Sequence, residues 1–129
     1  MRHRKNKFVL DRNASSRKAL LRSLANAVIL FERIKTTDAR AKAVRPMVER
    51  AITLGKDPTL AHRRLLMQRL GRRSTVAKVI EMLSPQYRER KGGYTRIIRV
   101  GRRRGDAAEI VQLEFVHVAD VAKVSKATS

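Results

Sequence analysis

Two stretches of the chain are dense in basic side chains, and these are its best candidates for binding an anionic ligand. The first stretch opens the sequence and holds Arg2, Arg4, Lys5, Lys7 and Arg12 against one acidic residue, Asp11. The second stretch has Glu89 as its one acidic residue and contains Arg88, Arg90, Lys91, Arg96, Arg99, Arg102, Arg103 and Arg104. Arginine dominates it, and the planar guanidinium donates two parallel hydrogen bonds to a phosphate group. The pattern therefore predicts phosphate binding.

Catalytic and metal-binding patterns are absent from the sequence. It contains no GxxxxGK[ST], GxGxxG, HExxH or GxSxG motif. The chain has no cysteine, which excludes disulfides, a thiolate nucleophile and cysteine-ligated zinc. His3, His62 and His117 are widely separated in the sequence, and the 11 acidic residues offer little material for a paired-carboxylate site. We therefore predict no enzymatic activity, no metal and no cofactor.

The overall charge points to a polyanionic partner. The 31 Lys and Arg residues against 11 Asp and Glu residues give a net charge of +20 over 129 residues, so the chain repels itself. Nucleic acid is the first candidate for neutralising this charge, and an anionic membrane surface is the second. No apolar run approaches the roughly 18 to 20 residues that span a bilayer, and the first residues lack the apolar stretch of a secretory signal.

Four stretches have apolar residues at helical spacing. We predict helices from Ser15 or Ser16 to Phe31, from Thr37 or Asp38 to Leu54, from Asp57-Pro58 to Leu70, and from Ser74 to Ser84-Pro85. The inward face of the first helix should hold Leu20, Leu21, Leu24, Ala27, Val28 and Phe31. Pro46 lies inside the second helix on its polar side, where it should bend the helix.

β-Branched residues and strict alternation predict strands elsewhere. A short strand over Arg33 to Thr36 separates two helices, and strands over Thr95 to Val100 and Glu109 to Val118 should pair as a hairpin with a basic tip. The order is helix, strand, three helices, two strands. It predicts a two-layer α+β domain over residues 14–118, in which helices pack on one face of a three-stranded sheet. Residues 1–13 should form an extended basic RNA-binding arm, and residues 119–129 a disordered tail.

The small number of aromatic residues indicates which kind of nucleic acid the chain would bind. The chain has three Phe, two Tyr and no Trp, which is few for a module that stacks unpaired bases. Contacts with the backbone and shape of folded RNA are therefore favoured. An architectural DNA-binding protein and a membrane-surface protein remain alternatives. However, no recognition element or dimer pattern is visible, and the hairpin gives the first helix a surface to bury its apolar face against.

Several specific blocks resemble the bacterial ribosomal protein L17 family of the large subunit. They are Met1-Arg-His-Arg-Lys5, Arg12-Asn13 with Ser15 and Arg17, Ile34-Lys-Thr-Thr37, Leu83 to Arg90, Lys91-Gly-Gly-Tyr-Thr-Arg-Ile97 and Arg103-Arg-Gly-Asp106. The sequence departs from the family at Lys7-Phe8-Val9, where a glycine followed by basic residues is usual. The resemblance implies a structural, rRNA-binding component of the ribosome.

The resemblance also implies binding residues and partners. The residues that it assigns to rRNA are Arg2, His3, Arg4, Lys5, Arg12, Asn13, Ser15, Arg17, Lys35, Lys91 and Arg96. The charge pattern adds Lys7, Lys18, Arg22, Arg90, Arg99, Arg102, Arg103 and Arg104. The expected partners are 23S-type rRNA and neighbouring large-subunit proteins, with no membrane, one copy per ribosome and no homo-oligomer. Because no transit segment precedes the opening block, we expect a ribosome-bound protein of the bacterial cytoplasm.

Overall fold

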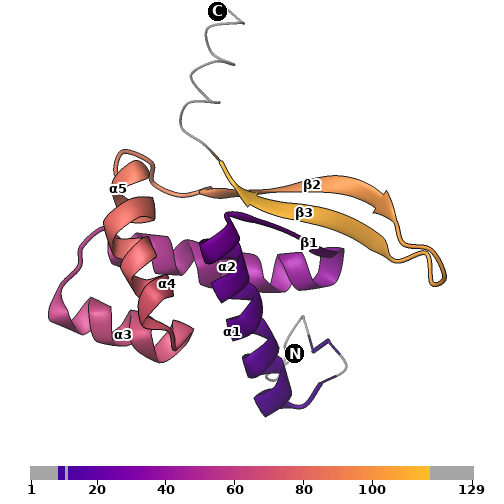
Figure 1. Cartoon of the computed structure of the whole chain (residues 1–129), viewed down its shortest axis with the longest axis horizontal. Helices are drawn as coiled ribbons and strands as arrows, with labels where there is room; N and C mark the ends of the chain where they lie inside the picture. Colours follow the sequence, from indigo (N-terminus) through magenta and orange to yellow (C-terminus); the bar gives the residue numbers. More distant parts are fainter. Residues whose placement is uncertain (1–8, 11, 117–129) are drawn as a thin grey trace, which may run out of the picture.

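The computed structural model describes residues 9, 10 and 12–116, and it has the predicted α+β architecture. The helices are α1 (Ala14–Phe31), α2 (Asp38–Gly55), α3 (Leu60–Leu70), α4 (Arg73–Lys78), the π-helical turn η1 (Val79–Leu83) and α5 (Ser84–Gln86). The strands are β1 (Arg33–Thr37), β2 (Thr95–Arg102) and β3 (Glu109–Phe115). Figure 1 shows the helices on one side of the sheet and the β2–β3 hairpin reaching beyond them.

The three strands form one antiparallel sheet in the order β1-β3-β2. On β3 the buried Val111, Leu113 and Phe115 alternate with the half-buried Gln112 and Glu114, as predicted for a strand covered on one face. The hairpin prediction is confirmed, although β2 extends to Arg102 and β3 ends at Phe115. The sheet therefore presents one face to the helices and leaves the other uncovered.

Helix α2 supplies much of the core between the other helices and the sheet. Its buried apolar residues include Val44, Val48, Ala51 and Ile52, and Pro46 is exposed within one continuous helix. The prediction for the end of α1 was wrong in one position, because Phe31 is 73% exposed. The helix ends at Glu32, which adopts a φ of 66°, so the chain turns into β1 and leaves Phe31 outside the core.

Burial is unevenly distributed on α1 and α3. On α1 it centres on Ala25, Val28 and Ile29, because the helix is covered on more than one side by α2, α3 and α4. On α3, Leu66 and Leu70 are buried, whereas Leu60 and Met67 are exposed. A short helix at the edge of the core buries only a narrow stripe.

Helix starts differ from the predicted caps by a few residues. Asn13 caps α1, since its side-chain oxygen accepts a hydrogen bond of 2.8 Å from the amide of Ser16. Thr59 caps α3 in place of Asp57, and its hydroxyl accepts from the amide of His62. The fourth helix begins after Arg72 and not after Ser74. A side-chain oxygen reaches an unpaired amide at the starts of α1 and α3, whereas α4 begins without a side-chain cap.

The predicted helix end at Ser84-Pro85 was wrong. The wider π-helical turn Val79–Leu83 leads directly into α5, and the amide of Ser84 donates to the carbonyl of Val79. Pro85 thereby lies within a continuous helical stretch, to which it contributes no backbone N–H donor. The N-terminal arm, apart from residues 9, 10, 12 and 13, and the tail 119–129 lie outside the described residues, so both stay predictions.

Candidate nucleic-acid interface

The start of α1 brings together four residues that the sequence assigned to RNA binding. Arg12 donates a hydrogen bond of 3.2 Å to the hydroxyl of Ser16, and the Asn13 side chain is used as the helix cap. Ser15 is exposed and Arg17 is half-buried. The first turn contains no acidic residue, so Arg12 and Arg17 add to the positive end of the helix dipole. This end of the helix suits an anion.

The arm residues Arg2, His3, Arg4, Lys5 and Lys7 lie outside the described residues, and their assignment stays a prediction.

Lys18 and Arg22 of α1 have different surroundings. Lys18 is exposed, whereas the guanidinium of Arg22 donates to the carbonyls of Arg69 (3.1 Å) and Gln68 (2.8 Å). These carbonyls close the last turn of α3, where a cation also complements the negative end of the helix dipole. Arg22 therefore positions α3 against α1, and Lys18 is the freer of the two for an external anion.

The uncovered face of the sheet is basic. The register places Glu114 between Arg33 and Arg96, and Lys35 beside Gln112. Desolvation raises the pKa of Glu114, but hydrogen bonds from Arg96 and Gln112 outweigh it and leave that pKa below its usual value. Glu114 is thus ionised near neutral pH and balances Arg96. Arg33 and Lys35 are exposed, and they give this face its excess positive charge.

The hairpin tip carries the predicted arginine run, but not all of its charges are free. Arg103 forms a bidentate ion pair with Asp106, with N···O distances of 3.1 and 2.6 Å. Arg99 forms an ion pair with Glu109 at 3.2 Å. In the part of the chain that the structure describes, Arg102 and Arg104 have no acidic partner. The tip therefore presents these two guanidinium groups to the outside.

Asp106 organises the tip as well as neutralising Arg103. Its carboxylate also accepts a hydrogen bond of 3.2 Å from the amide of Ala108. The hydrogen bond from Arg103 and that amide lower the pKa of Asp106 to about 2. Because the folded-state pKa is depressed, the pair persists above the ordinary carboxyl pKa and is lost as the pH falls through about 2.

Replacing Asp106 with asparagine should free a third guanidinium at the tip. We expect Asp106→Asn to steepen the salt dependence of RNA binding by up to about one ion equivalent, because Arg103 becomes available to phosphate. Fluorescence anisotropy with a folded RNA at several salt concentrations measures the slope. A shallower slope would mean that the ordered turn, and not the free charge, matters for binding.

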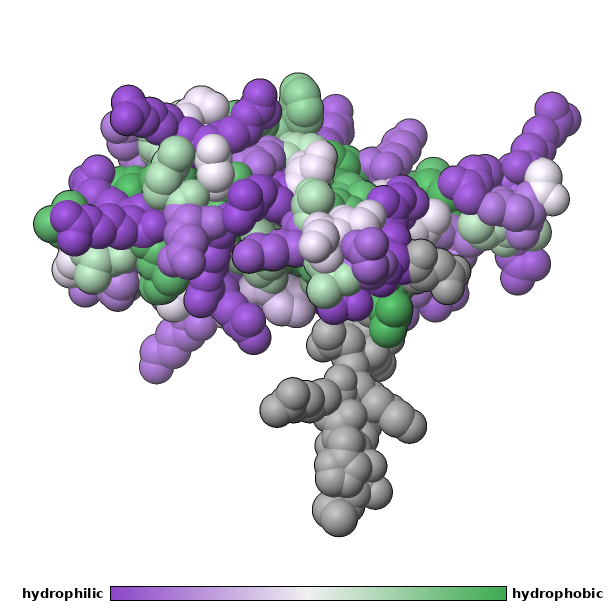
Figure 2. Space-filling model, turned by 90° about the horizontal axis from the view of Figure 1, so that it is seen from below, coloured by the Kyte–Doolittle hydropathy of each residue, from purple (hydrophilic) through white to green (hydrophobic). Residues whose placement is uncertain are grey.

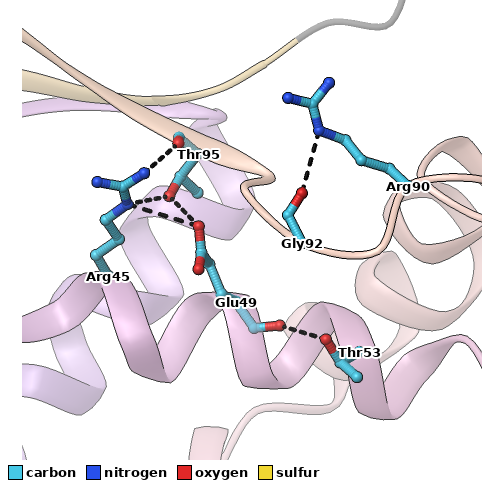
Figure 3. A network of polar contacts seen from close by, with 6 residues as sticks. All are labelled: Arg45, Glu49, Thr53, Arg90, Gly92 and Thr95. Carbon is cyan, nitrogen blue, oxygen red and sulfur yellow. Dashed lines mark hydrogen bonds and ion pairs between the residues drawn. The ribbon is translucent and has the colours of Figure 1, made fainter.

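The loop before β2 carries Arg90 and Lys91, and Figure 3 shows Arg90 bonded to Gly92 within it. The guanidinium of Arg90 donates to the carbonyl of Gly92 at 3.2 Å, and the Arg90 carbonyl accepts from the ammonium of Lys56. The side chain of Lys91 is exposed. Arg90 thus shapes the loop, and Lys91 is directed outward from it.

A polar network fixes the start of β2 to α2 (Figure 3). Arg45 donates to both the hydroxyl (3.1 Å) and the carbonyl (2.9 Å) of Thr95, and the Thr95 hydroxyl donates to Glu49 at 3.0 Å. Arg45 and Glu49 also form an ion pair of 3.5 Å on successive turns of α2. The loop that ends at Thr95 is therefore anchored at a buried residue.

The tyrosines do not offer free stacking surfaces. Tyr87 and Tyr94 are each 1% exposed and pack together with Phe115 in the core. The Tyr87 hydroxyl donates to the carbonyl of Val116 at 2.6 Å, and burial, reinforced by Glu32, raises its pKa to about 12. Their burial supports recognition of backbone phosphates over stacking on unpaired bases.

Sequence reasoning missed several basic residues outside the two dense stretches. Those exposed on α2, α3 and the turn into α4 are Arg50, Arg63, Arg64, Arg69, Arg72 and Arg73. The sequence could have indicated that some of these cations are unpaired. Arg50, Arg63, Arg64 and Arg69 each lack an acidic residue three or four positions away, where an ion pair within the helix would form. Figure 2 shows hydrophilic side chains projecting over most of the face seen there, with small hydrophobic areas between them.

Within residues 9, 10 and 12–116, no three His, Cys, Asp or Glu side chains come close enough to hold a metal ion. The helices of the same region include none with the length and apolar character needed to cross a bilayer.

Comparison with known proteins gives a consistent result. The family model described as ribosomal protein L17 matches residues 20–116. The large ribosomal subunit protein bL17 of Thermomicrobium roseum is 47% identical over 116 residues, which cover 90% of this chain and 99% of that protein. The bL17 protein of Bdellovibrio bacteriovorus is 51% identical over 114 residues (88% of this chain, 63% of that protein). That of an Exiguobacterium strain is 49% identical over 112 residues (83% and 96%).

Proposed function

The chain belongs to the ribosomal protein L17 family, and from this membership we propose that it is a structural component of the large ribosomal subunit. In this proposal it binds and stabilises folded rRNA through Arg and Lys contacts to phosphates, and so supports translation without catalysing a reaction. The observation that carries the proposal is the distribution of exposed, unpaired cations. They lie on the helical layer, the uncovered sheet face and the hairpin tip, for example at Lys18, Lys35 and Arg104.

The distribution of charge favours RNA with a folded shape. Cations on several surfaces fit a protein enclosed by rRNA segments on more than one side, because each surface can neutralise phosphates independently. The residues that we assign to these contacts are those predicted from the sequence, with Arg22, Arg90, Arg96 and Arg103 also holding the protein's own structure. The arm of residues 1–13 would order along RNA on binding.

The names of the relatives assign those proteins to the large ribosomal subunit. We further propose that the partners of this chain are large-subunit rRNA of the 23S type and the proteins beside it, with one copy of this chain per ribosome and no homo-oligomer. The protein would act in the bacterial cytoplasm, bound to ribosomes.

Sedimentation tests this proposal. We expect the tagged protein in a lysate to migrate with large subunits after low magnesium separates the two subunits, and high salt to release it, since the contacts are ionic. Treatment with ribonuclease before the gradient should move it to the top, whereas deoxyribonuclease should not. Migration with DNA or with membrane vesicles, or free protein at low salt, would contradict the proposal.

A further inference from the structure

Two adjoining hollows beside α2 bring the predicted Lys18 and Lys91 together with Arg50 and Arg69, which sequence reasoning did not single out. The larger, of about 510 Å³, is lined on three elements by Arg50 of α2, Arg69 of α3 and Lys91 of the loop before β2. The smaller, of about 330 Å³, is lined by Lys18 of α1, Met47 of α2 and again Arg69. Because Arg69 borders both hollows, the two adjoin, and we call them together the α2 groove.

The cations of the α2 groove are not neutralised by the protein. Among the residues that the structure describes, Lys18, Arg50, Arg69 and Lys91 form no ion pair. One carboxylate, that of Glu49, lines the larger hollow. It is already engaged by Arg45 and by the hydroxyl of Thr95. The groove therefore keeps an excess of positive charge.

The walls of the α2 groove are held in place by the contacts described above. Arg22 ties the last turn of α3, which carries Arg69, to α1. The loop that carries Lys91 is fixed by the bond from Lys56 to the carbonyl of Arg90, and the hydroxyls of Thr53 and Tyr94 lie 3.3 Å apart. A concave basic surface assembled from rigid elements binds an anion with little ordering cost.

The same geometry indicates which part of a nucleic acid would bind. The ring of Tyr94 lines the larger hollow, but it is 1% exposed and Lys56 lies over it, 4.6 Å from the ring centre. No aromatic face of this hollow is therefore open to a base. Three cations on separate elements surround this hollow. They suit a row of successive phosphates on one strand better than they suit a single anionic group.

We propose that the α2 groove binds the phosphate backbone of an RNA segment through Arg50, Arg69 and Lys91, with Lys18 extending the contact onto α1. This site rests on the proposed function and adds to it Arg50 and Arg69, which lie outside the two dense basic stretches.

Directed cleavage of RNA tests the location. The chain has no cysteine, so Gly92→Cys introduces a unique attachment point for an iron–EDTA reagent at the lining of the groove. A Cβ at Gly92 meets nothing within 4 Å, so the substitution should not disturb the fold. Bound to a 23S rRNA transcript, the labelled full chain should cleave a short contiguous set of nucleotides.

Neutralising the groove should remove this cleavage. In the Gly92→Cys background, Arg50→Gln, Arg69→Gln and Lys91→Gln together should abolish the local cleavage and make the salt slope of binding shallower by up to about three ion equivalents. The matched control, Arg63→Gln, Arg64→Gln and Arg73→Gln, removes the same charge outside the groove and should keep the cleavage positions.

Each other outcome has a defined meaning. If the groove variant keeps both the slope and the cleavage pattern, the groove is not an RNA site and the proposed function stands. If RNA binding is unchanged but incorporation of other subunit proteins fails, the groove contacts protein and the proposal is overturned. If the unsubstituted chain prefers no rRNA over unrelated RNA, the proposed function fails, and the groove proposal fails with it.

Discussion

Affinity for a folded large-subunit rRNA fragment is expected to fall by about 10³ to 10⁵ between about 50 and 200 mM salt. This range corresponds to roughly six to ten neutralised phosphates, each of which releases condensed counterions on binding. The chain has enough unpaired cations for that number, because its net charge is +20 and the described ion pairs engage few of its basic residues. A plot of log Kd against log salt concentration gives the number of contacts directly.

The hairpin tip should account for part of that slope. Replacing Arg102, Arg103 and Arg104 with Ala should make the slope shallower by about two to three ion equivalents and weaken binding to several folded RNAs similarly. The lower value applies if Arg103 stays paired with Asp106 on RNA. Lys42→Ala is a suitable control, because Lys42 is paired with Asp38 at 2.8 Å and should contribute little.

Two results would contradict this account of the tip. An unchanged slope would mean that the tip faces solvent or protein, and the contribution of the hairpin would pass to Arg90, Lys91 and Arg96 near its other end. Loss of preference for rRNA over unrelated duplex, with affinity spared, would mean that these side chains read bases, and phosphate contact would no longer explain recognition.

The order of elements could be predicted because the information is local. Alternating Val111, Leu113 and Phe115 identify a strand covered on one face, and helical spacing identifies α2, whichever neighbours they later meet. Their ends could not be predicted as well. The extension through Pro85 depends on a π-helical turn, and the exposure of Phe31 depends on the path from Glu32 into β1. Both are settled by tertiary packing.

The candidate interface could likewise be predicted only in part from the sequence. A dense basic stretch shows how many cations are available, but not which of them the fold uses. Arg22 caps a helix some 46 residues further along, and Arg96 meets a carboxylate 18 residues away across the sheet. Conversely, Arg50 and Arg69 stand alone in the sequence and come together only because α2 and α3 pack side by side. Pairings between elements therefore require the structure.

The contact of α2 with η1 and α5 depends on a residue without a side chain. Gly55 is buried at the end of α2, and a Cβ there would lie 2.3 Å from the hydroxyl oxygen of Ser84 and 2.8 Å from a methyl carbon of Val79. Ser84 is itself buried and donates a hydrogen bond of 3.0 Å to the carbonyl of Ile52. The hydroxyl therefore has little freedom to move away.

Gly55→Ala should destabilise the protein by about 2 kcal/mol, measured as a lower urea midpoint with an unchanged m value. Overpacking costs about 1 to 3 kcal/mol, and displacing the Ser84 hydroxyl costs about 1 kcal/mol more through its lost hydrogen bond. Better helix propensity returns only about 1 kcal/mol. Gly92→Ala is the control, because open space surrounds that position and the change should stay within about 0.5 kcal/mol.

A second substitution separates the two causes. In the Gly55→Ala background, Ser84→Ala removes the nearest atom and should recover part of the loss, while the methyl group of Val79 continues to oppose the added Cβ. If Gly55→Ala instead stabilises the protein by about 1 kcal/mol, helix propensity dominates, and the π-helical turn yields without cost.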